Sequence, residues 1–352
     1  MKKPEIIYVY HSNSTFIEKD VEFLHERYSV DLDTYNWNQK FLVPLILTVQ
    51  FFKLLTKSNA NTVYVVMFAG FWSVIPTWLA KTFGRKAFII VGGTDCVSFP
   101  EFNYGSMRKG LYRKSIEYSL KNCTAILPVS SELVQYDYTY FDAEIKKQGY
   151  LSFFPDVKTP HKVIYNGYEI PAQKPGIERK PNSFITVAKI TNSVLYELKG
   201  IDVIRELATR KPELSFTIVG ISESVVFEFR LNELPNLKCV PFVGSYELDK
   251  LYREHQFYMC LSLSEGFPNA LSEGMSYGCV PIGSNVSAIP FIIGKTGFVL
   301  DTRDGNSLLN LTEQILQLSK EELSERSTLA KERIRNQFSL EKRKVAFYEL
   351  IG

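Results

Sequence analysis

Short apolar blocks alternate with longer amphipathic stretches along the first half of the chain. Blocks of four or five consecutive apolar residues predict strands that are buried on both faces of a sheet. The stretches between them have the spacing of amphipathic helices. The predicted strands are 6–10, 63–67, 87–91, 125–129 and 162–165, and the predicted helices include 17–26, 72–81 and 108–121. This alternation indicates a parallel sheet with helices on both faces.

The second half repeats the alternation after residues 171–182, which are rich in Pro, Lys and Glu and predict a linker. Its predicted strands are 183–188, 214–219, 237–242, 257–261 and 280–283, and its predicted helices are 200–209, 245–254, 268–277 and 307–318. A charged helical segment, 320–351, comes last. We therefore expect an α/β fold with two doubly wound domains, residues 1–168 and 169–337.

Composition narrows the class of protein. A chain of 352 residues is long enough for two full cores, and a net charge of +3 is too small to indicate nucleic-acid binding. The five cysteines are scattered without metal-type spacing and predict free thiols in a reducing compartment: Cys96, Cys123, Cys239, Cys260 and Cys279. Residues 1–6 contain no apolar core of secretory length, so we expect a cytoplasmic protein.

Two apolar stretches imitate membrane segments. Residues 62–80 contain no charge, but Gly70, Ser73 and Pro76 interrupt them, so a buried strand followed by a helix is the better interpretation. Residues 41–52 are shorter and contain Pro44. They predict a core helix, with attachment to a membrane interface as the alternative.

The segment Ser264–Gly278 contains the most informative pattern. Gly266 fits a tight turn after an apolar strand, Pro268 fits the first helical position, and Gly278 fits the residue after a helix end. Glu265 lies in the turn and Glu273 in the second turn of the helix. A helix N-terminus binds phosphate, and carboxylates on either side accept hydrogen bonds from sugar hydroxyls. The pattern therefore suggests a pocket for a nucleotide sugar.

This segment closely resembles the donor-site signature of the retaining glycosyltransferases of family 4, glycosyl transferases group 1, which have the GT-B fold. That fold has two Rossmann-like domains facing each other across a cleft, and the resemblance implies the same here. It also implies that the last helix, 338–352, crosses back onto the first domain. The implied reaction moves a sugar from a nucleoside diphosphate to a hydroxyl acceptor, a glycan or glycolipid of cell-surface polysaccharide synthesis, with no metal and no cofactor.

The resemblance assigns roles to residues of the second domain. Lys189 and Lys199 would stabilise the departing diphosphate, because fixed cations act best where water is excluded. Glu265 would face the transferred sugar, and Glu273 would accept both ribose hydroxyls. The remaining donor-binding candidates are the segment Gly266, Phe267, Pro268, Asn269 and Ala270 and the base-contacting pair Val243 and Gly244.

The match is weaker in the first domain, which binds the acceptor in this family. Gly92-Gly93-Thr94-Asp95 resembles a segment that often contains His and then Asp, with Gly92 in place of the His. Asp95 is a candidate for orienting a sugar hydroxyl or the acceptor, and a turn or capping residue is the alternative. His11, at the end of the first strand, is a second candidate; a structural role is the alternative.

Two further motifs have ordinary explanations. Asp31-Leu32-Asp33 matches the Asp-x-Asp metal motif of the other major glycosyltransferase fold, but it lies outside the donor motifs, so we infer no metal from it. The basic cluster Arg108, Lys109, Arg113 and Lys114 predicts a solvated helix face. Peripheral contact with the inner face of a membrane, or with a phosphate-bearing lipid acceptor, is the alternative.

The sequence leaves two other functions open. A nucleotide-sugar epimerase would need the same donor site without an acceptor. A non-catalytic binding partner would retain the fold, and Gly92 in place of His favours it. A glycan phosphorylase would need pyridoxal phosphate, for which the chain has no convincing lysine motif.

Overall fold

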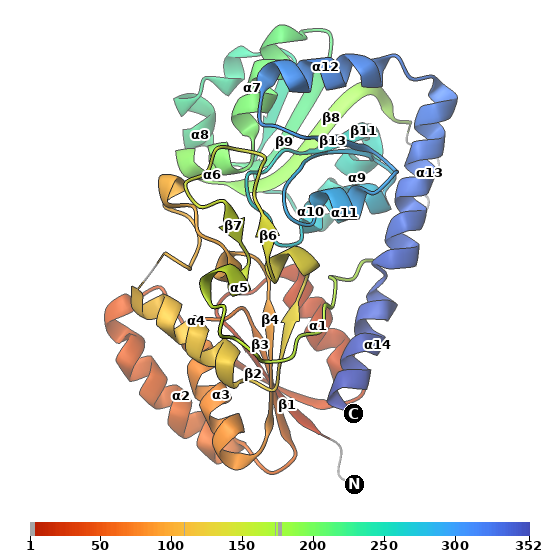
Figure 1. Cartoon of the computed structure of the whole chain (residues 1–352). Helices are drawn as coiled ribbons and strands as arrows, with labels where there is room; N and C mark the ends of the chain where they lie inside the picture. Colours follow the sequence, from red (N-terminus) through yellow and green to blue (C-terminus); the bar gives the residue numbers. More distant parts are fainter. Residues whose placement is uncertain (1–3, 109, 173, 175–177) are drawn as a thin grey trace. The chain divides into compact units, whose positions relative to one another are not determined.

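The computed structural model describes residues 4–108, 110–172, 174 and 178–352 (Figure 1). The chain divides into two compact units. The first comprises residues up to 137, 144–167 and 340–352, and the second comprises 138–143 and 168–339. No helix of the described residues is both long and apolar enough to cross a membrane.

The first unit is built on a five-stranded parallel sheet with the strand order β2-β1-β3-β4-β5. Its strands are β1 (Glu5–Tyr10), β2 (Ser29–Thr34), β3 (Thr62–Met67), β4 (Lys86–Val91) and β5 (Ala125–Pro128). Its main helices are α1 (Thr15–His25), α2 (Val43–Lys57), α3 (Phe71–Phe83), α4 (Gly110–Asn122) and α14 (Leu340–Ile351). Helices α2, α3 and α4 cover one face of the sheet, and α1 and α14 cover the other (Figure 1). Two short strands, β6 (Tyr136–Asp137) and β7 (Lys147–Gln148), and the short helix α5 (Tyr150–Phe153) complete it.

A buried ion pair fastens α14 to this unit. The Arg343 guanidinium donates to both carboxylate oxygens of Asp20 on α1, at 2.6 and 2.7 Å. Arg343 also donates to the carbonyl oxygens of Ile164 and Tyr165, and the Tyr8 hydroxyl donates to Asp20 Oδ2. Both charged side chains are almost completely buried. Because all their hydrogen bonds are internal, neither partner tolerates loss of the other.

The second unit contains a six-stranded parallel sheet with the order β10-β9-β8-β11-β12-β13. Its strands are β8 (Lys180–Ile190), β9 (Ser215–Ile221), β10 (Leu237–Val240), β11 (His255–Cys260), β12 (Val280–Ser284) and β13 (Phe298–Leu300). Its helices are α6 (Ser193–Leu198), α7 (Ile201–Arg210), α8 (Glu223–Glu228), α9 (Ser245–Glu254), α10 (Asn269–Ser276), α11 (Ile289–Ile293), α12 (Gly305–Leu316) and α13 (Lys320–Gln337). Three stacked rings, Phe216, Phe184 and Phe257, cross its centre on neighbouring strands.

The α/β prediction with two doubly wound sheets is confirmed, and several details differ. Residues 162–165 were expected as a strand; they run along β5 through separate hydrogen bonds, Lys162 N to Ile126 O and Ile164 N to Pro128 O, without forming one. Strand β2 was not foreseen, because it alternates polar residues at the sheet edge. The charged segment 320–351 breaks into α13 and α14 at Phe338 and Ser339.

Replacing Arg343 by Ala should lower the free energy of unfolding by about 3–5 kcal/mol, because it leaves Asp20 as a buried charge without its partner. Urea denaturation followed by circular dichroism measures this change. Lys344→Ala is the matched control on the same helix, since Lys344 pairs with Glu26 at the surface, and it should leave the midpoint nearly unchanged. Equal losses in the two variants would contradict a special contribution of the buried pair.

Candidate functional site

The second unit has a cavity where its sheet reverses its winding direction. The strand order reverses between β8 and β11, the place where open α/β sheets bind their ligands. The cavity has a volume of about 340 Å³ and lies between the end of β8, the α6–α7 junction, the loop after β11 and the start of α10. It is lined by Thr186, Val187, Ala188, Lys189, Leu195, Lys199, Tyr258, Met259, Cys260, Ser262, Glu265, Pro268, Asn269 and Ala270.

A cation and a carboxylate meet on the wall of this cavity. Lys199 Nζ lies 2.5 Å from Glu265 Oε1, and the Ser262 hydroxyl donates to the same oxygen at 2.7 Å. Both charged side chains are mostly buried, with 23% and 16% of their surfaces exposed. The pair therefore holds an ammonium group in a fixed position beside the cavity, where an anionic ligand would meet it.

Gly200 brings Lys199 to this position. Its backbone is left-handed, with φ +67°, and a Cβ atom there would lie 2.2 Å from the Leu261 carbonyl oxygen. Only glycine permits this close approach of the α6–α7 junction to the loop after β11. This approach places Lys199 beside Glu265, which lies four residues after Leu261. It gives a steric reason for the glycine that follows Lys199.

The start of α10 adds a second source of positive potential. Pro268 precedes the helix as its N-cap, with φ −71°, and makes no side-chain capping bond to it. The prediction that Pro268 is the first helical residue is therefore one position early. The amide groups of the first turn of α10 have no partner within the helix, and Asn269 and Ala270 of this turn line the cavity. Two lysines and a helix N-terminus converge on one volume, an arrangement suited to phosphate.

Burial also determines the state of the other cavity side chains. The Tyr258 hydroxyl donates to the Val187 carbonyl oxygen at 3.2 Å, joining β11 to β8. Burial, together with the nearby Glu265 carboxylate, raises the pKa of the Cys260 thiol to about 12. This thiol therefore stays protonated near neutral pH and is a poor nucleophile.

The structure thus brings together six of the predicted donor-site residues and places the others around them. Glu273 is half-buried one turn along α10 and accepts a hydrogen bond from the Tyr252 hydroxyl at 3.3 Å. Phe267 is buried and stacks on Tyr168 with ring centroids 6.2 Å apart. Gly266, in the turn, and Val243 and Gly244, before α9, do not line the cavity.

Sequence reasoning missed Ser262, Tyr258 and the contact of Gly200 with Leu261. Ser262 lies three residues before Glu265. This spacing permits their hydrogen bond but does not by itself predict it. Tyr258 lies in an apolar strand and gives no local signal. These contacts depend on which strands become neighbours, and that is a property of the whole sheet.

The first unit has a larger cavity of about 750 Å³. It also lies at a reversal of strand order, here between β1 and β3. Aromatic side chains dominate its wall, and among the described residues no carboxylate lines it. The lining residues are His11, Trp37, Asn38, Val43, Pro44, Phe68, Ala69, Phe71, Trp72, Thr94, Asn103, Tyr104, Gly105, Ser106, Arg108, Leu111 and Tyr112.

Two polar atoms on this wall lack a hydrogen-bond partner among the described residues. They are His11 Nδ1 and Trp37 Nε1, both buried. The His11 ring stacks on Trp72 with centroids 4.3 Å apart, and burial lowers the pKa of the imidazole, so it is neutral at pH 7. Unpaired buried polar atoms cost free energy, and a ligand with hydroxyl groups would satisfy them.

Asp95 lies beside this cavity but does not line it. Its carboxylate is buried and accepts hydrogen bonds from the amides of Gly92, Gly93 and Ala69, at 3.1, 3.0 and 3.0 Å. Burial raises its pKa to about 6, and the amide hydrogen bonds oppose that shift. This geometry is that of a turn-stabilising carboxylate, the alternative that the sequence left open; a role in catalysis stays a prediction. At position 92 a Cβ atom would lie 2.4 Å from the Phe68 ring.

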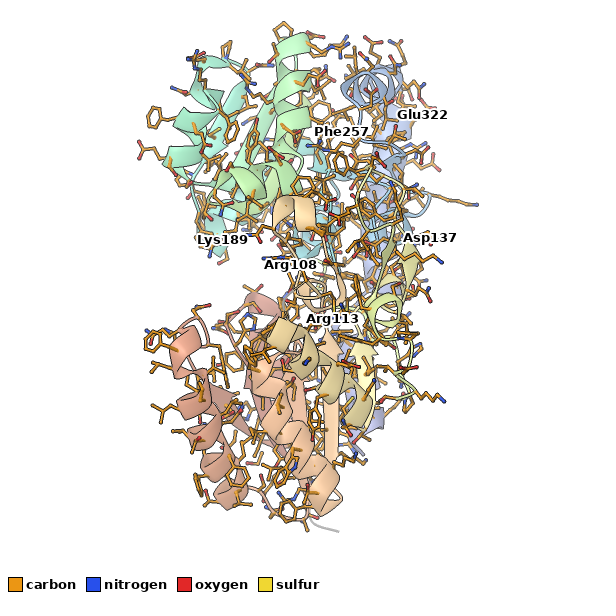
Figure 2. The ribbon with its side chains drawn as sticks, turned by 60° about the vertical axis from the view of Figure 1, so that its left-hand side comes forward. Arg108, Arg113, Asp137, Lys189, Phe257 and Glu322 are labelled. Carbon is orange, nitrogen blue, oxygen red and sulfur yellow. The ribbon has the colours of Figure 1, made fainter. Side chains whose placement is uncertain are left out.

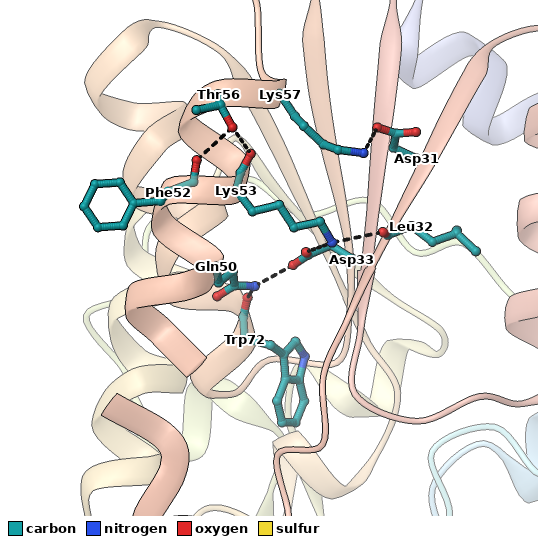
Figure 3. Close-up of polar contacts among 9 residues, drawn as sticks. All are labelled: Asp31, Leu32, Asp33, Gln50, Phe52, Lys53, Thr56, Lys57 and Trp72. Carbon is teal, nitrogen blue, oxygen red and sulfur yellow. Dashed lines mark hydrogen bonds and ion pairs between the residues drawn. The ribbon is translucent and has the colours of Figure 1, made fainter. Parts of the chain in front are cut away.

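The two aspartates of the Asp31-Leu32-Asp33 motif form ion pairs in the structure. Asp33 pairs with Lys53 at 2.6 Å and Asp31 with Lys57 at 2.8 Å, both lysines belonging to α2 (Figure 3). Within the described part of the chain, no group of three or more His, Cys, Asp or Glu side chains is arranged for a metal ion. Arg108 precedes α4 and Arg113 lies on it (Figure 2). Arg113 and Lys114 are exposed, and Lys109 lies outside the described residues.

Comparison with known proteins finds a family match within the second domain. Residues 184–319 match the family model of the glycosyl transferases group 1. No curated protein sequence matches the chain.

Solved structures resemble the fold over the whole chain. Sucrose-phosphate synthase from Thermosynechococcus elongatus is 14% identical, with a TM-score of 0.75 and coverage of 99% of this chain and 98% of that one. Anabaena HepE in complex with UDP-glucose is 12% identical, with a TM-score of 0.69 and coverage of 99% of both chains. TarM is 14% identical with a TM-score of 0.65; the match covers 87% of this chain and only 58% of TarM.

At these identities the solved structures establish the fold alone, and that fold is GT-B. The family match agrees, over residues 184–319, with the resemblance to the group 1 glycosyltransferases found in the sequence. The separate roles of Lys189, Lys199, Glu265 and Glu273 stay predictions.

Gly200→Ala should destabilise the protein and weaken the donor site. The left-handed backbone alone costs a residue with a Cβ atom about 1–2 kcal/mol, and the contact with Leu261 O adds to that cost. Thermal unfolding and nucleotide affinity measure the two effects. Gly110→Ala is the control, since its Cβ atom would meet open space at the start of α4, and it should keep both values. Unchanged stability and affinity in Gly200→Ala would contradict the steric role.

Proposed function

Because its second domain matches the group 1 glycosyltransferases, we propose that this protein is a retaining glycosyltransferase that uses a nucleoside-diphosphate sugar. One observation carries the proposal: Lys189, Lys199 and the N-terminus of α10 border the same cavity at the strand-order reversal. A diphosphate that leaves a sugar accumulates negative charge, and preorganised cations and amide dipoles stabilise that charge. These positive groups do the work for which many other transferases use a metal ion.

The donor lies in the second domain in this proposal. Its diphosphate contacts Lys199, Lys189 and the first turn of α10, while Glu265 accepts hydrogen bonds from the sugar. Glu273 accepts hydrogen bonds from the ribose, displacing the bond from Tyr252, and Val243 and Gly244 lie toward the base. Glu265 and Ser262 also hold the Lys199 ammonium in place before the donor arrives. Solved structures of the same fold were determined with UDP and with UDP-glucose, which makes uracil the first base to test.

The transfer itself needs no protein nucleophile. The acceptor oxygen bonds to the anomeric carbon on the face from which the diphosphate departs, so the configuration is retained. The bond from that carbon to the diphosphate oxygen breaks, and the acceptor proton passes to that oxygen. The products are the glycosylated acceptor and the nucleoside diphosphate.

The cavity of the first domain supplies the acceptor side in this proposal. Aromatic rings stack on pyranose faces, and the unpaired Nδ1 of His11 and Nε1 of Trp37 meet acceptor hydroxyls. The acceptor is a glycan or a lipid-linked glycan of cell-surface polysaccharide synthesis. A cytoplasmic protein with peripheral contact to the inner face of a membrane, through Arg108, Arg113 and Lys114, fits such an acceptor.

A binding partner without transfer activity is the second candidate. The Phe68 ring occupies the space of a side chain at Gly92, and Asp95 holds a turn. Both features leave the first domain without the His-Asp pair that the family resemblance leads one to expect. A nucleotide-sugar epimerase would differ from the transferase and from the binding partner, because it would convert the nucleotide sugar without any acceptor.

Nucleotide binding should raise the thermal unfolding midpoint by a few degrees without Mg²⁺. A ligand at a hundred times its dissociation constant adds about 2.7 kcal/mol of stability. Differential scanning fluorimetry with UDP, GDP, ADP and CMP measures the shift, and we expect UDP to give the largest one. A shift that requires Mg²⁺ would contradict metal-independent binding, and no shift with any nucleotide would contradict the donor site.

Lys199→Ala should lower turnover of the nucleotide sugar about 100-fold or more, because it removes a cation that acts on the leaving group. Release of the nucleoside diphosphate measures turnover. The control is Lys250→Ala, an exposed lysine on α9, which should turn over normally. Folding is checked by the thermal midpoint of each variant. Near-normal activity in Lys199→Ala would refute the assignment of this lysine.

A further inference from the structure

Helix α2 is apolar on two opposite sides. Its buried side, formed by Val43, Gln50 and Leu54, packs on the rest of the first domain. The opposite side exposes Leu45, Val49, Phe52 and Leu55, which fall within about a third of the helix circumference at 3.6 residues per turn. Leu45 and Phe52 each expose 60% of their surface. A helix at the surface of a soluble domain normally has polar residues there, so this side lacks the usual pattern.

The longer polar side chains of α2, those of Gln50, Lys53 and Lys57, make contacts with the rest of the first domain. Lys53 and Lys57 bind Asp33 and Asp31 of the edge strand β2, and the Gln50 amide donates to Asp33 and to the Trp72 carbonyl oxygen (Figure 3). These contacts fix the rotation of the helix about its axis. Four polar contacts therefore keep the side that bears Leu45, Val49, Phe52 and Leu55 turned toward solvent. The exposure of these side chains is not the result of poor packing.

The apolar surface continues onto the neighbouring helices. The Phe51 ring contacts Phe52 and Trp78, with centroids 5.3 and 5.8 Å apart, and Trp78 on α3 is 40% exposed. A groove of about 350 Å³ runs between α2, α3 and α4 and is lined by Phe51, Val74, Ile75, Trp78 and Tyr118. Phe41, before α2, and Leu111, on α4, expose 80% and 77% of their surfaces. We call this area the α2 face.

The charge of the same region is strongly positive. Residues 41–122 contain ten lysines and arginines and three acidic residues, a net charge of +7, whereas the whole chain has +3. The rest of the chain therefore carries −4. Helices α2 and α3 contain no acidic residue, and α4 contains one, Glu117, which pairs with Lys121. Lysines and arginines around an apolar row complement a surface that is anionic outside and apolar inside.

We propose that the α2 face docks onto an anionic lipid bilayer. Leu45, Val49 and Phe52 enter the boundary between headgroups and acyl chains, and the surrounding basic residues, among them Lys81 and Lys114, contact lipid phosphates. A second copy of the chain fits less well, since two copies of this positively charged region repel each other. The proposal concerns binding to the membrane and is independent of the transfer activity. The sequence left membrane contact open both for residues 41–52 and for the basic cluster at α4; the structure assigns the apolar part of it to α2.

Cosedimentation with vesicles tests this inference. The probes are vesicles of phosphatidylcholine alone and vesicles of equal parts phosphatidylcholine and phosphatidylglycerol, with the full chain. We expect binding to the anionic vesicles that weakens as salt is added. The double variant Leu45→Asn/Phe52→Asn should lower the partition coefficient about tenfold or more. Lys114→Gln should lower it about fivefold.

Phe227→Asn in the second domain is the matched control, since Phe227 is 61% exposed on α8, and it should bind as the unmodified protein does. Unchanged thermal midpoints and unchanged nucleotide-induced shifts establish that each variant is folded. Absence of binding to anionic vesicles, or equal binding by the double variant, would overturn the proposal. So would a dimer in sedimentation velocity that the double variant abolishes, because the face would then belong to a second copy.

Discussion

Both cavities of this protein depend on one constraint of parallel sheets, the right-handed crossover. When the strand order reverses, successive helices leave on opposite faces, and the loops at the carboxyl ends of the two central strands diverge. The reversal lies between β1 and β3 in the first sheet and between β8 and β11 in the second. Each cavity lies at one of these points. The winding of the sheets therefore determines where chemistry takes place, and the loops determine which chemistry.

The loops at the two reversals have opposite chemical character. In the second domain the backbone approach of Gly200 to Leu261 holds Lys199 beside Glu265, and α10 directs its amide groups at the same cavity. In the first domain the loops bring together aromatic rings and two unpaired polar atoms. Fixed charge suits a polyanionic leaving group, whereas aromatic surface suits a sugar ring.

Sequence reasoning succeeded where a signal is local. Buried strands such as Thr62–Met67 are continuous apolar runs, and the Glu265 turn has its glycine, proline and helix in one stretch. It failed at the edge strand β2, because an edge strand is apolar on one face only. The aromatic cavity was also missed, since Trp37, Phe68 and Tyr112 lie far apart in sequence and meet only after the sheet has formed.

The position of α14 has a consequence for how the chain folds during synthesis. Asp20 emerges from the ribosome early, yet its partner Arg343 is translated more than three hundred residues later. The whole second domain up to Ser339 is made in between and can complete its own core first. Until then the first sheet exposes the surface that α14 covers, together with a carboxylate destined for burial. The domain translated first is therefore the last to reach its native state, and a nascent chain stalled before α14 would need protection of that surface.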